Sequence, residues 1–180
     1  MSYYRELKDF ILQLKGGGHF LSPRDVWFLK FLEEEGYPLE VIREGIKKFF
    51  LFHPPEKRSK LPLFMSFREI QKLRRLHMGK ASGNEDWRER FLRKVRLAEE
   101  ILKRELNVHV PEDLKEAEDT LQRLEGEMAK KIWEGLSREE KASILRRFSS
   151  FKGDEELFKS MVKRELFRRK GLKGLSLFVD

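Results

Sequence analysis

The sequence predicts an all-α protein, in which an N-terminal helical subdomain is followed by a long antiparallel helical hairpin. Apolar residues recur every three or four positions along most of the chain, as they do on one face of an α-helix. Alternating β-branched runs, which are typical of strands, are nearly absent. With 180 residues, of which 39% are hydrophobic, the chain is long enough to bury a core.

Residues 1–78 are expected to form the N-terminal helical subdomain. Ser22 and Pro23 are a strong helix start, because serine caps free amide groups and proline fits the first turn. The helix that follows is apolar on nearly every side, so we expect it to lie at the centre. Helices are expected over residues 4–14, 23–35, 38–50 and 66–76, with a basic loop from 53 to 62 and a linker from 78 to 84.

Residues 84–170 are expected to form the hairpin and the C-terminal helices. The first long helix is expected over 85–106, and Pro111 is expected to start the second. Asp154 and the pair Ser137 and Glu140 are expected to cap the last two helices. The second long helix has the 3-4 spacing of a coiled-coil seam, which predicts packing within the chain or a dimer contact. The seam residues are Leu114, Ala117, Leu121, Leu124 and Met128.

The composition excludes several classes of protein. There is no cysteine, so disulfides and cysteine–zinc sites are excluded. No segment approaches the roughly 20 apolar residues of a membrane span, and no signal-peptide pattern begins the chain, so we expect a cytoplasmic protein without membrane contact. Abundant Lys, Glu and Arg, with few Asn and Gln, suggest a thermophile as the source.

The net charge of +8 is concentrated in two stretches. Residues 57–80 hold eight basic residues and one acid, and residues 159–173 hold seven and one. Such patches favour contact with nucleic-acid phosphates, although a charged surface facing only water is the alternative. Phe64 and Phe67 would stack on bases if they are exposed, and otherwise they belong to the core. The residues expected to contact phosphates are Lys57, Arg58, Lys60, Arg68, Lys72, Arg74 and Arg75.

No catalytic, cofactor or metal site is predicted. The four histidines are far apart in the sequence and lie near predicted helix ends, where they are not spaced as metal ligands. The run of glycines at 16–18 follows no strand and precedes no Gly-Lys-Ser/Thr, so we interpret it as a hinge and not a phosphate loop. The chain is therefore expected not to be an enzyme.

The last ten residues form an apolar tail after Gly171, which is expected to end the last helix. The tail either packs on its own domain or binds another protein. Residues 174–178, Gly-Leu-Ser-Leu-Phe, resemble the Gln-Leu-Ser/Asp-Leu-Phe pentapeptide by which bacterial replication and repair proteins bind the DNA sliding clamp. Gly174 replaces the glutamine of that motif. The resemblance implies that the clamp is a partner and that Leu175, Ser176, Leu177 and Phe178 would bind it.

Residues 20–75 show a second resemblance. Leu-Ser-Pro at 21–23, Glu-Gly-Tyr-Pro at 35–38 and Val-Ile-Arg-Glu-Gly-Ile at 41–46 are similar to the helical domain of DnaD-type replication-initiation proteins. Gly45 stands where that family commonly has alanine, and the Tyr-x-x-x-Ile-x-x-x-Trp pattern of the family is not found after Lys60. The resemblance implies contact with single-stranded DNA or with the primosome.

Both resemblances lead to one hypothesis, a non-enzymatic accessory protein of DNA replication or repair. Its partners would be DNA, which the second resemblance implies to be single-stranded, and the sliding clamp. The alternative is a structural interaction protein, in which the hairpin over residues 85–132 mediates formation of a homo-oligomer and the basic patches are ordinary surface.

Overall fold

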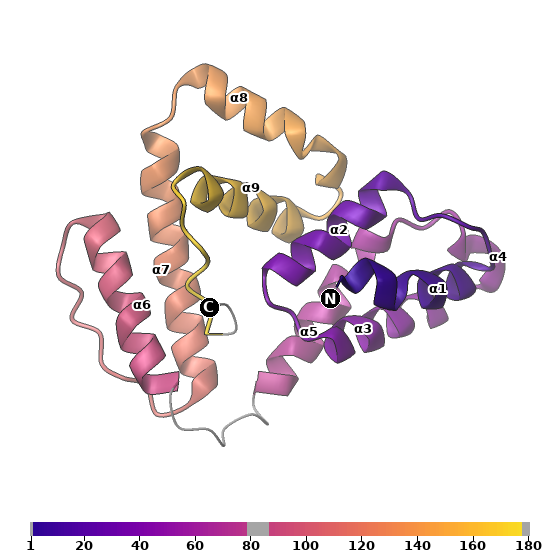
Figure 1. Cartoon of the computed structure of the whole chain (residues 1–180), viewed down its shortest axis with the longest axis horizontal. Helices are drawn as coiled ribbons and strands as arrows, with labels where there is room; N and C mark the ends of the chain where they lie inside the picture. The colour runs from indigo at the N-terminus through magenta and orange to yellow at the C-terminus, as the bar shows by residue number, and fades with distance from the viewer. Residues whose placement is uncertain (1, 79–86, 178–180) are drawn as a thin grey trace. The chain divides into compact units, whose positions relative to one another are not determined.

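The computed structural model describes residues 2–78 and 87–177, which belong to two compact units (Figure 1). Unit 1 comprises Met1–His77 and Ser150–Leu157, and unit 2 comprises Met78–Ser149 and Phe158–Asp180. The described residues form nine α-helices and two short 3-10 helices, and they contain no strand. The predicted all-α class is therefore confirmed.

Unit 1 contains a bundle of short helices whose ends are defined by local signals. Ser22 caps α2 by accepting a hydrogen bond from the Asp25 amide at 3.1 Å, as the sequence predicted. The helices are α1 (Tyr3–Lys15), α2 (Pro23–Glu34), α3 (Leu39–Leu51), α4 (Pro55–Arg58), the 3-10 helix η1 (Leu63–Ser66) and α5 (Phe67–Met78). The short α4 lies within the stretch that the sequence predicted to be a loop.

An aromatic cluster forms much of the core of unit 1. The ring of Phe67 lies 6.2 Å, between centroids, from each of the rings of Phe28, Phe31 and Tyr37. Phe67 is fully buried and Phe64 is 5% exposed. Of the two alternatives for these phenylalanines, the core position is therefore the one observed, and neither ring is available to stack on a base.

The first boundary between the units, at His77 and Met78, falls at the start of the predicted linker over residues 78–84, but the division differs from the predicted one later in the chain. The segment Ser150–Leu157, which was expected to belong with the hairpin and C-terminal helices, is part of unit 1. Its 3-10 helix η2 (Ser149–Phe151) brings the buried ring of Phe151 to 5.6 Å from the ring of Phe64. Unit 1 is thus built from two segments of the chain, because an apolar side chain distant in the sequence completes its core.

Unit 2 contains the predicted hairpin and two further helices. These are α6 (Trp87–Leu102), α7 (Leu114–Glu134), α8 (Arg138–Arg147) and α9 (Glu155–Arg169). The first three residues of α9, up to Leu157, belong to unit 1. All five seam residues of α7 are buried. The seam therefore packs within the chain, which is one of the two alternatives that its spacing left open.

The hairpin helices are shorter than expected. Helix α6 ends at Leu102 and is followed by Lys103 in the left-handed conformation, with φ of 53°. Helix α7 begins at Leu114, and not at Pro111, because the carboxylate of Asp113 caps it by accepting a hydrogen bond from the Glu116 amide at 2.8 Å. The predicted start was therefore wrong by about one turn.

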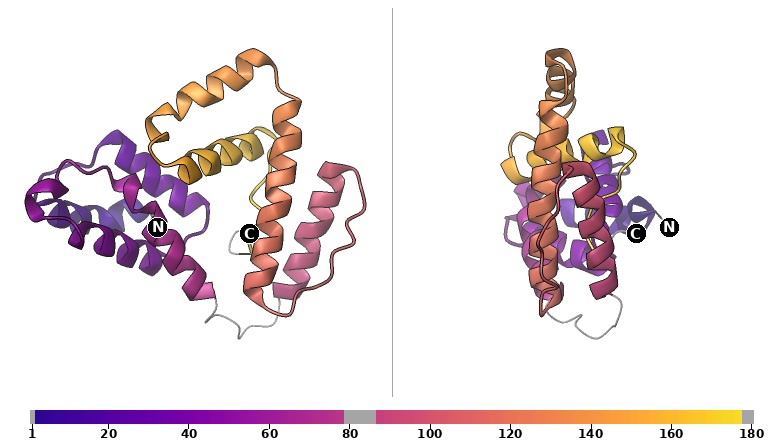
Figure 2. Two further views of the ribbon diagram at one scale, coloured as in Figure 1. Left: turned by 180° about the vertical axis from the view of Figure 1, so that it is seen from behind. Right: turned by 90° about the vertical axis from the view of Figure 1, so that its left-hand side faces the viewer.

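The ends of the last two helices follow the predicted chemistry. Ser137 and Glu140 form the expected capping box at α8, and Asp154 accepts a hydrogen bond from the Leu157 amide at α9. Gly171 has φ of 66° and ends the last helix, with the Leu172 amide donating to the Phe167 carbonyl. The chain then turns back and runs beside α7 within unit 2 (Figure 2).

Candidate nucleic-acid interface and the C-terminal segment

The seven predicted phosphate-binding residues do not form a single patch. Lys57 and Arg58 belong to α4, and Lys60 follows it, whereas the other four belong to α5. Helix α4 and the C-terminal end of α5 lie at opposite ends of unit 1 (Figure 1). The basic stretch of the sequence therefore gives two separate groups of cations.

The first group is a stripe along α5, made of Arg68, Lys72 and Arg75. All three side chains are exposed, and their i, i+4, i+7 spacing places them on one face of the helix. Seven residues of helix rise about 10 Å, so the stripe extends over that length. Glu69 pairs with Lys72 at 3.3 Å in an exposed contact, which is expected to be weak.

Arg74 has a structural position instead. It is 7% exposed, and its guanidinium carbon lies 4.0 Å from the centre of the Tyr37 ring. One of its terminal nitrogens lies 3.4 Å from the backbone oxygen of Glu35. Arg74 therefore fastens α5 to the turn between α2 and α3, and phosphate contact would require it to leave these partners.

The second group surrounds α4. Lys57 and Lys60 are exposed, whereas Arg58 is half-buried and its Nε donates a hydrogen bond to the His53 carbonyl at 2.9 Å. Arg58 is thereby held against its own turn. Of the seven predicted residues, five present exposed cations: Lys57, Lys60, Arg68, Lys72 and Arg75.

Sequence reasoning missed an exposed aromatic residue, Phe20, which is 82% exposed. Its ring borders a cavity of about 290 Å³ that Arg24 and Lys60 also line. Lys15 lines the same cavity, but its ammonium pairs with Asp25 at 2.7 Å. The signal that could have found Phe20 is its place directly after the glycine run and His19, outside every predicted apolar helix face.

The C-terminal segment is held by two acidic side chains of α7. The carboxylate of Glu125 accepts a hydrogen bond from the Leu175 amide at 2.5 Å, and that of Glu118 accepts one from the Leu177 amide at 3.0 Å. Both acids are buried, and Lys163 neutralises Glu125 with a contact of 2.8 Å. We call residues 174–177 the strap.

Helix α6 holds the strap from its other edge. Lys94 donates a hydrogen bond to the Gly174 carbonyl at 3.1 Å, and Arg90 donates one to the Leu177 carbonyl at 3.3 Å. Leu175, Ser176 and Leu177 are 0%, 8% and 4% exposed. These residues therefore pack on their own unit, while Phe178 lies outside the described residues.

The structure gives a reason for Gly174. A Cβ atom added there would lie 3.1 Å from the Oε1 of Glu125, the oxygen that accepts the Leu175 amide. A side chain at this position would crowd the buried acceptor. Glycine in place of the glutamine of the clamp motif is thus consistent with packing of the strap.

In the second basic stretch, over residues 159–173, several cations are already engaged. Glu165 is 4% exposed and contacts Arg168 at 2.8 Å, Arg169 at 3.2 Å and Arg147 at 3.3 Å. The hydrogen bonds from Arg168 hold the pKa of this carboxyl below its usual 4.5, although burial acts in the opposite direction. This stretch is therefore partly an internal ion-pair network.

The described residues hold neither a cluster of metal ligands nor a membrane-spanning helix. Within residues 2–78 and 87–177, no three or more His, Asp or Glu side chains are grouped as metal ligands would be. In the same part of the chain, every helix is too short or too polar to cross a membrane.

Comparison with known proteins shows one relative across nearly the whole chain. A protein of the thermophile Aquifex aeolicus (strain VF5), described as "Uncharacterized protein", is 42% identical over 176 residues, which cover 96% of this chain and 98% of its own. A family model described as "Uncharacterised protein" matches residues 2–86. No solved structure matches the chain.

Proposed function

The chain belongs to the family of the Aquifex aeolicus protein, and we propose that it is a non-enzymatic accessory protein of DNA replication or repair. In this proposal unit 1 binds the phosphates of single-stranded DNA. The observation that supports it best is the exposed stripe of Arg68, Lys72 and Arg75 on one face of α5.

The stripe suits a phosphate backbone for two reasons. Its three cations extend over about 10 Å of one helix face, so they can contact successive phosphates of one strand. Each contact releases counterions, and this release drives nucleic-acid binding without regard to sequence. Phe20 lies beside Lys60, in the second group of cations, and would add a stacking surface for a base there, apart from the stripe. Its ring is exposed, whereas those of Phe64 and Phe67 are buried.

The first prediction concerns the stripe. We expect Arg68→Glu with Arg75→Glu to weaken binding of a fluorescent single-stranded oligonucleotide by at least about tenfold, measured by anisotropy at roughly 50 mM salt. The matched control is Lys47→Glu with Lys48→Glu, which makes the same change of charge at two exposed positions of α3. The control should change affinity by no more than about twofold.

The salt dependence gives an independent measure of the same contacts. Three phosphate contacts with a single strand predict a slope of log K against log salt of about −2 for the native chain. The Arg68→Glu, Arg75→Glu variant should have a slope closer to zero. Equal loss of affinity in both double variants, or a native slope near zero, would rule out the stripe as the binding surface.

The proposal includes the sliding clamp as a partner of residues 175–178, on the resemblance of the sequence alone. Because Leu175 and Leu177 are buried in unit 2, the clamp would bind only after the strap has left Glu118 and Glu125. The packed strap would thus keep the motif covered until it is released.

A comparison of peptide and whole chain tests the clamp. The probe is a fluorescent peptide of residues 172–180, with a Leu177→Ala, Phe178→Ala peptide as its control. We expect micromolar binding by the first peptide alone, and binding by the whole chain that is at least about tenfold weaker, because the chain must first open its strap. If the first peptide does not bind the clamp, this part of the proposal fails, whereas DNA binding by α5 is unaffected.

A further inference from the structure

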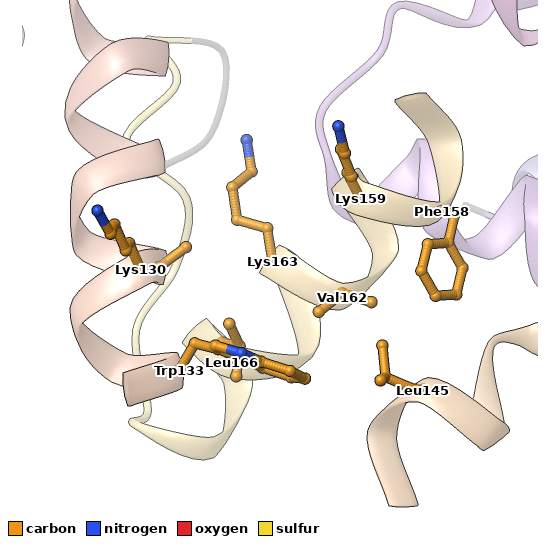
Figure 3. Close-up of a pocket in the computed structure, with 9 residues that line it drawn as sticks. Lys130, Trp133, Leu145, Phe158, Lys159, Val162, Lys163 and Leu166 are labelled. Atoms are coloured by element: carbon orange, nitrogen blue, oxygen red, sulfur yellow. The ribbon is translucent and has the colours of Figure 1, made fainter. Parts of the chain in front are cut away.

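Unit 2 has an apolar groove between α7, α8 and α9 (Figure 3). Its volume is about 500 Å³. The floor consists of side chains from all three helices, and Figure 3 shows most of them directed toward the same space. The apolar lining residues are Ala129, Trp133, Leu145, Phe158, Val162 and Leu166.

Much of this floor is accessible to solvent. Leu145 is 36% exposed, and Trp133, Phe158 and Val162 are half-buried. Single exposed apolar side chains are ordinary on a protein surface, but a contiguous group in a hollow is typical of an interaction site. The predicted seam of α7 does not explain this group, because the seam faces the interior and none of its five residues lines the groove.

Three lysines border the groove, namely Lys130 of α7 and Lys159 and Lys163 of α9. None of the described residues that line it is acidic. Lys163 also contacts Glu125 at 2.8 Å, and the ammonium of Lys141 lies 5.7 Å from the ring centre of Trp133. The immediate surroundings of the apolar floor are therefore positively charged.

We propose that the groove binds an acidic amphipathic helix of a partner protein. Phe158 and Val162, both half-buried, lie on successive turns of α9, and Leu166, which is 2% exposed, continues their line as a buried part of the floor. The line is about 12 Å long, which matches two turns of a helix laid against it. An apolar helix face in a groove between helices is a common mode of recognition. Glutamates or aspartates along one flank of that helix would face the lysines.

The placement of the lysines favours a helix over a small anionic amphiphile such as a fatty acid. Figure 3 shows the three ammonium groups separated along one side of the groove, and they do not converge at one end. A single carboxylate head would contact one of them, whereas a row of acidic side chains would follow the exposed Lys130 and Lys159 and reach Lys163 beside its partner Glu125.

A designed peptide tests the groove in the whole chain. The probe is a fluorescein-labelled helix of about 16 residues, with leucine at i, i+4 and i+7 and glutamate along the flanks. We expect micromolar binding, with Lys130→Glu and Lys159→Glu each weakening it by at least about fivefold. Leu145→Glu should abolish it. The control is Lys131→Glu, which makes the same change of charge at the next, exposed position of α7, outside the groove.

Three results would overturn the proposal. The first is an equal loss of affinity in Lys131→Glu, which would show only general attraction between opposite charges. The second is equal binding of a peptide that has lysine in place of each glutamate. The third is that the acidic peptide does not bind, while dodecanoate or a single-stranded oligonucleotide binds the native chain and does not bind the Lys159→Glu variant. All substituted side chains lie at the surface or the groove, and unchanged melting curves would confirm that the variants fold.

Discussion

At the scale of single residues, buried carboxylates organise unit 2. Glu118 and Glu125 accept the amides of the strap, and Glu165 gathers Arg147, Arg168 and Arg169. A buried carboxylate is costly unless it is paired and hydrogen-bonded. Glu125 and Glu165 are both, and Glu118 accepts the Leu177 amide. These acids therefore join segments that lie far apart in the sequence.

Glu165 makes unfolding dependent on pH. Its folded-state pKa is below the usual 4.5, so its contribution to stability is present above pH 4.5 and is lost as the pH falls through the folded-state pKa. We expect Glu165→Gln to lower the free energy of unfolding by about 1–2 kcal/mol near pH 7. The difference in free energy of unfolding between this variant and the native chain, measured by urea titration, should become smaller as the pH is lowered. Glu139→Gln, at an exposed position of α8, is the control and should change stability by less than about 0.5 kcal/mol at every pH.

At the scale of helices, the contact of α3 with α5 depends on Gly45. A Cβ atom at Gly45 would lie 2.5 Å from Cγ1 and 2.8 Å from Cα of Ile70, so the two helices approach too closely for any side chain there. Gly126 in α7 presents the contrasting case, since nothing lies within 4 Å of its added Cβ. The same substitution should therefore have opposite effects in the two helices.

We expect Gly45→Ala to destabilise the chain by about 1–3 kcal/mol, because α3 and α5 must move apart. Gly126→Ala should stabilise it by about 0.5–1 kcal/mol, because alanine favours the helical backbone and meets no obstacle. Urea denaturation of both variants measures the difference. A stabilising Gly45→Ala would show that the two helices are not in close contact.

At the scale of the whole molecule, the chain forms two units with separate cores, and the strap belongs to the second. Leu175 and Leu177 are among the buried side chains of unit 2. The tryptophans divide between the units, with Trp27 in unit 1 and Trp87 and Trp133 in unit 2. Fluorescence can therefore follow each core separately.

We expect Leu175→Ala to destabilise unit 2 by about 2–5 kcal/mol, because it leaves a cavity at a fully buried position. In a chain whose only tryptophan is Trp133, the unfolding midpoint should shift to lower urea. In a chain whose only tryptophan is Trp27, the midpoint should stay where it was. Equal shifts by both probes would show that the units unfold as one.

The sequence by itself determined most of the helices and several of their ends, although the short α4, the end of α6 and the start of α7 were not predicted. The caps at Ser22, Ser137 and Asp154 and the stop at Gly171 depend on hydrogen bonds within a few residues, so short patterns suffice to predict them. The seam of α7 was predicted for a similar reason, because its period is a property of one helix. The start of α7 was missed because the prediction followed Pro111, whereas the carboxylate of Asp113 accepts the hydrogen bond that caps the helix.

Only the tertiary structure decided which predicted surfaces stay exposed. Arg74 and Arg68 are alike in the sequence, yet Tyr37 covers Arg74 and nothing in the sequence places Tyr37 beside it. The strap, the joining of Ser150–Leu157 to unit 1 and the groove bordered by lysines likewise depend on contacts between distant segments. Such contacts follow from how whole apolar faces pack together, and the residues near each position do not specify that packing.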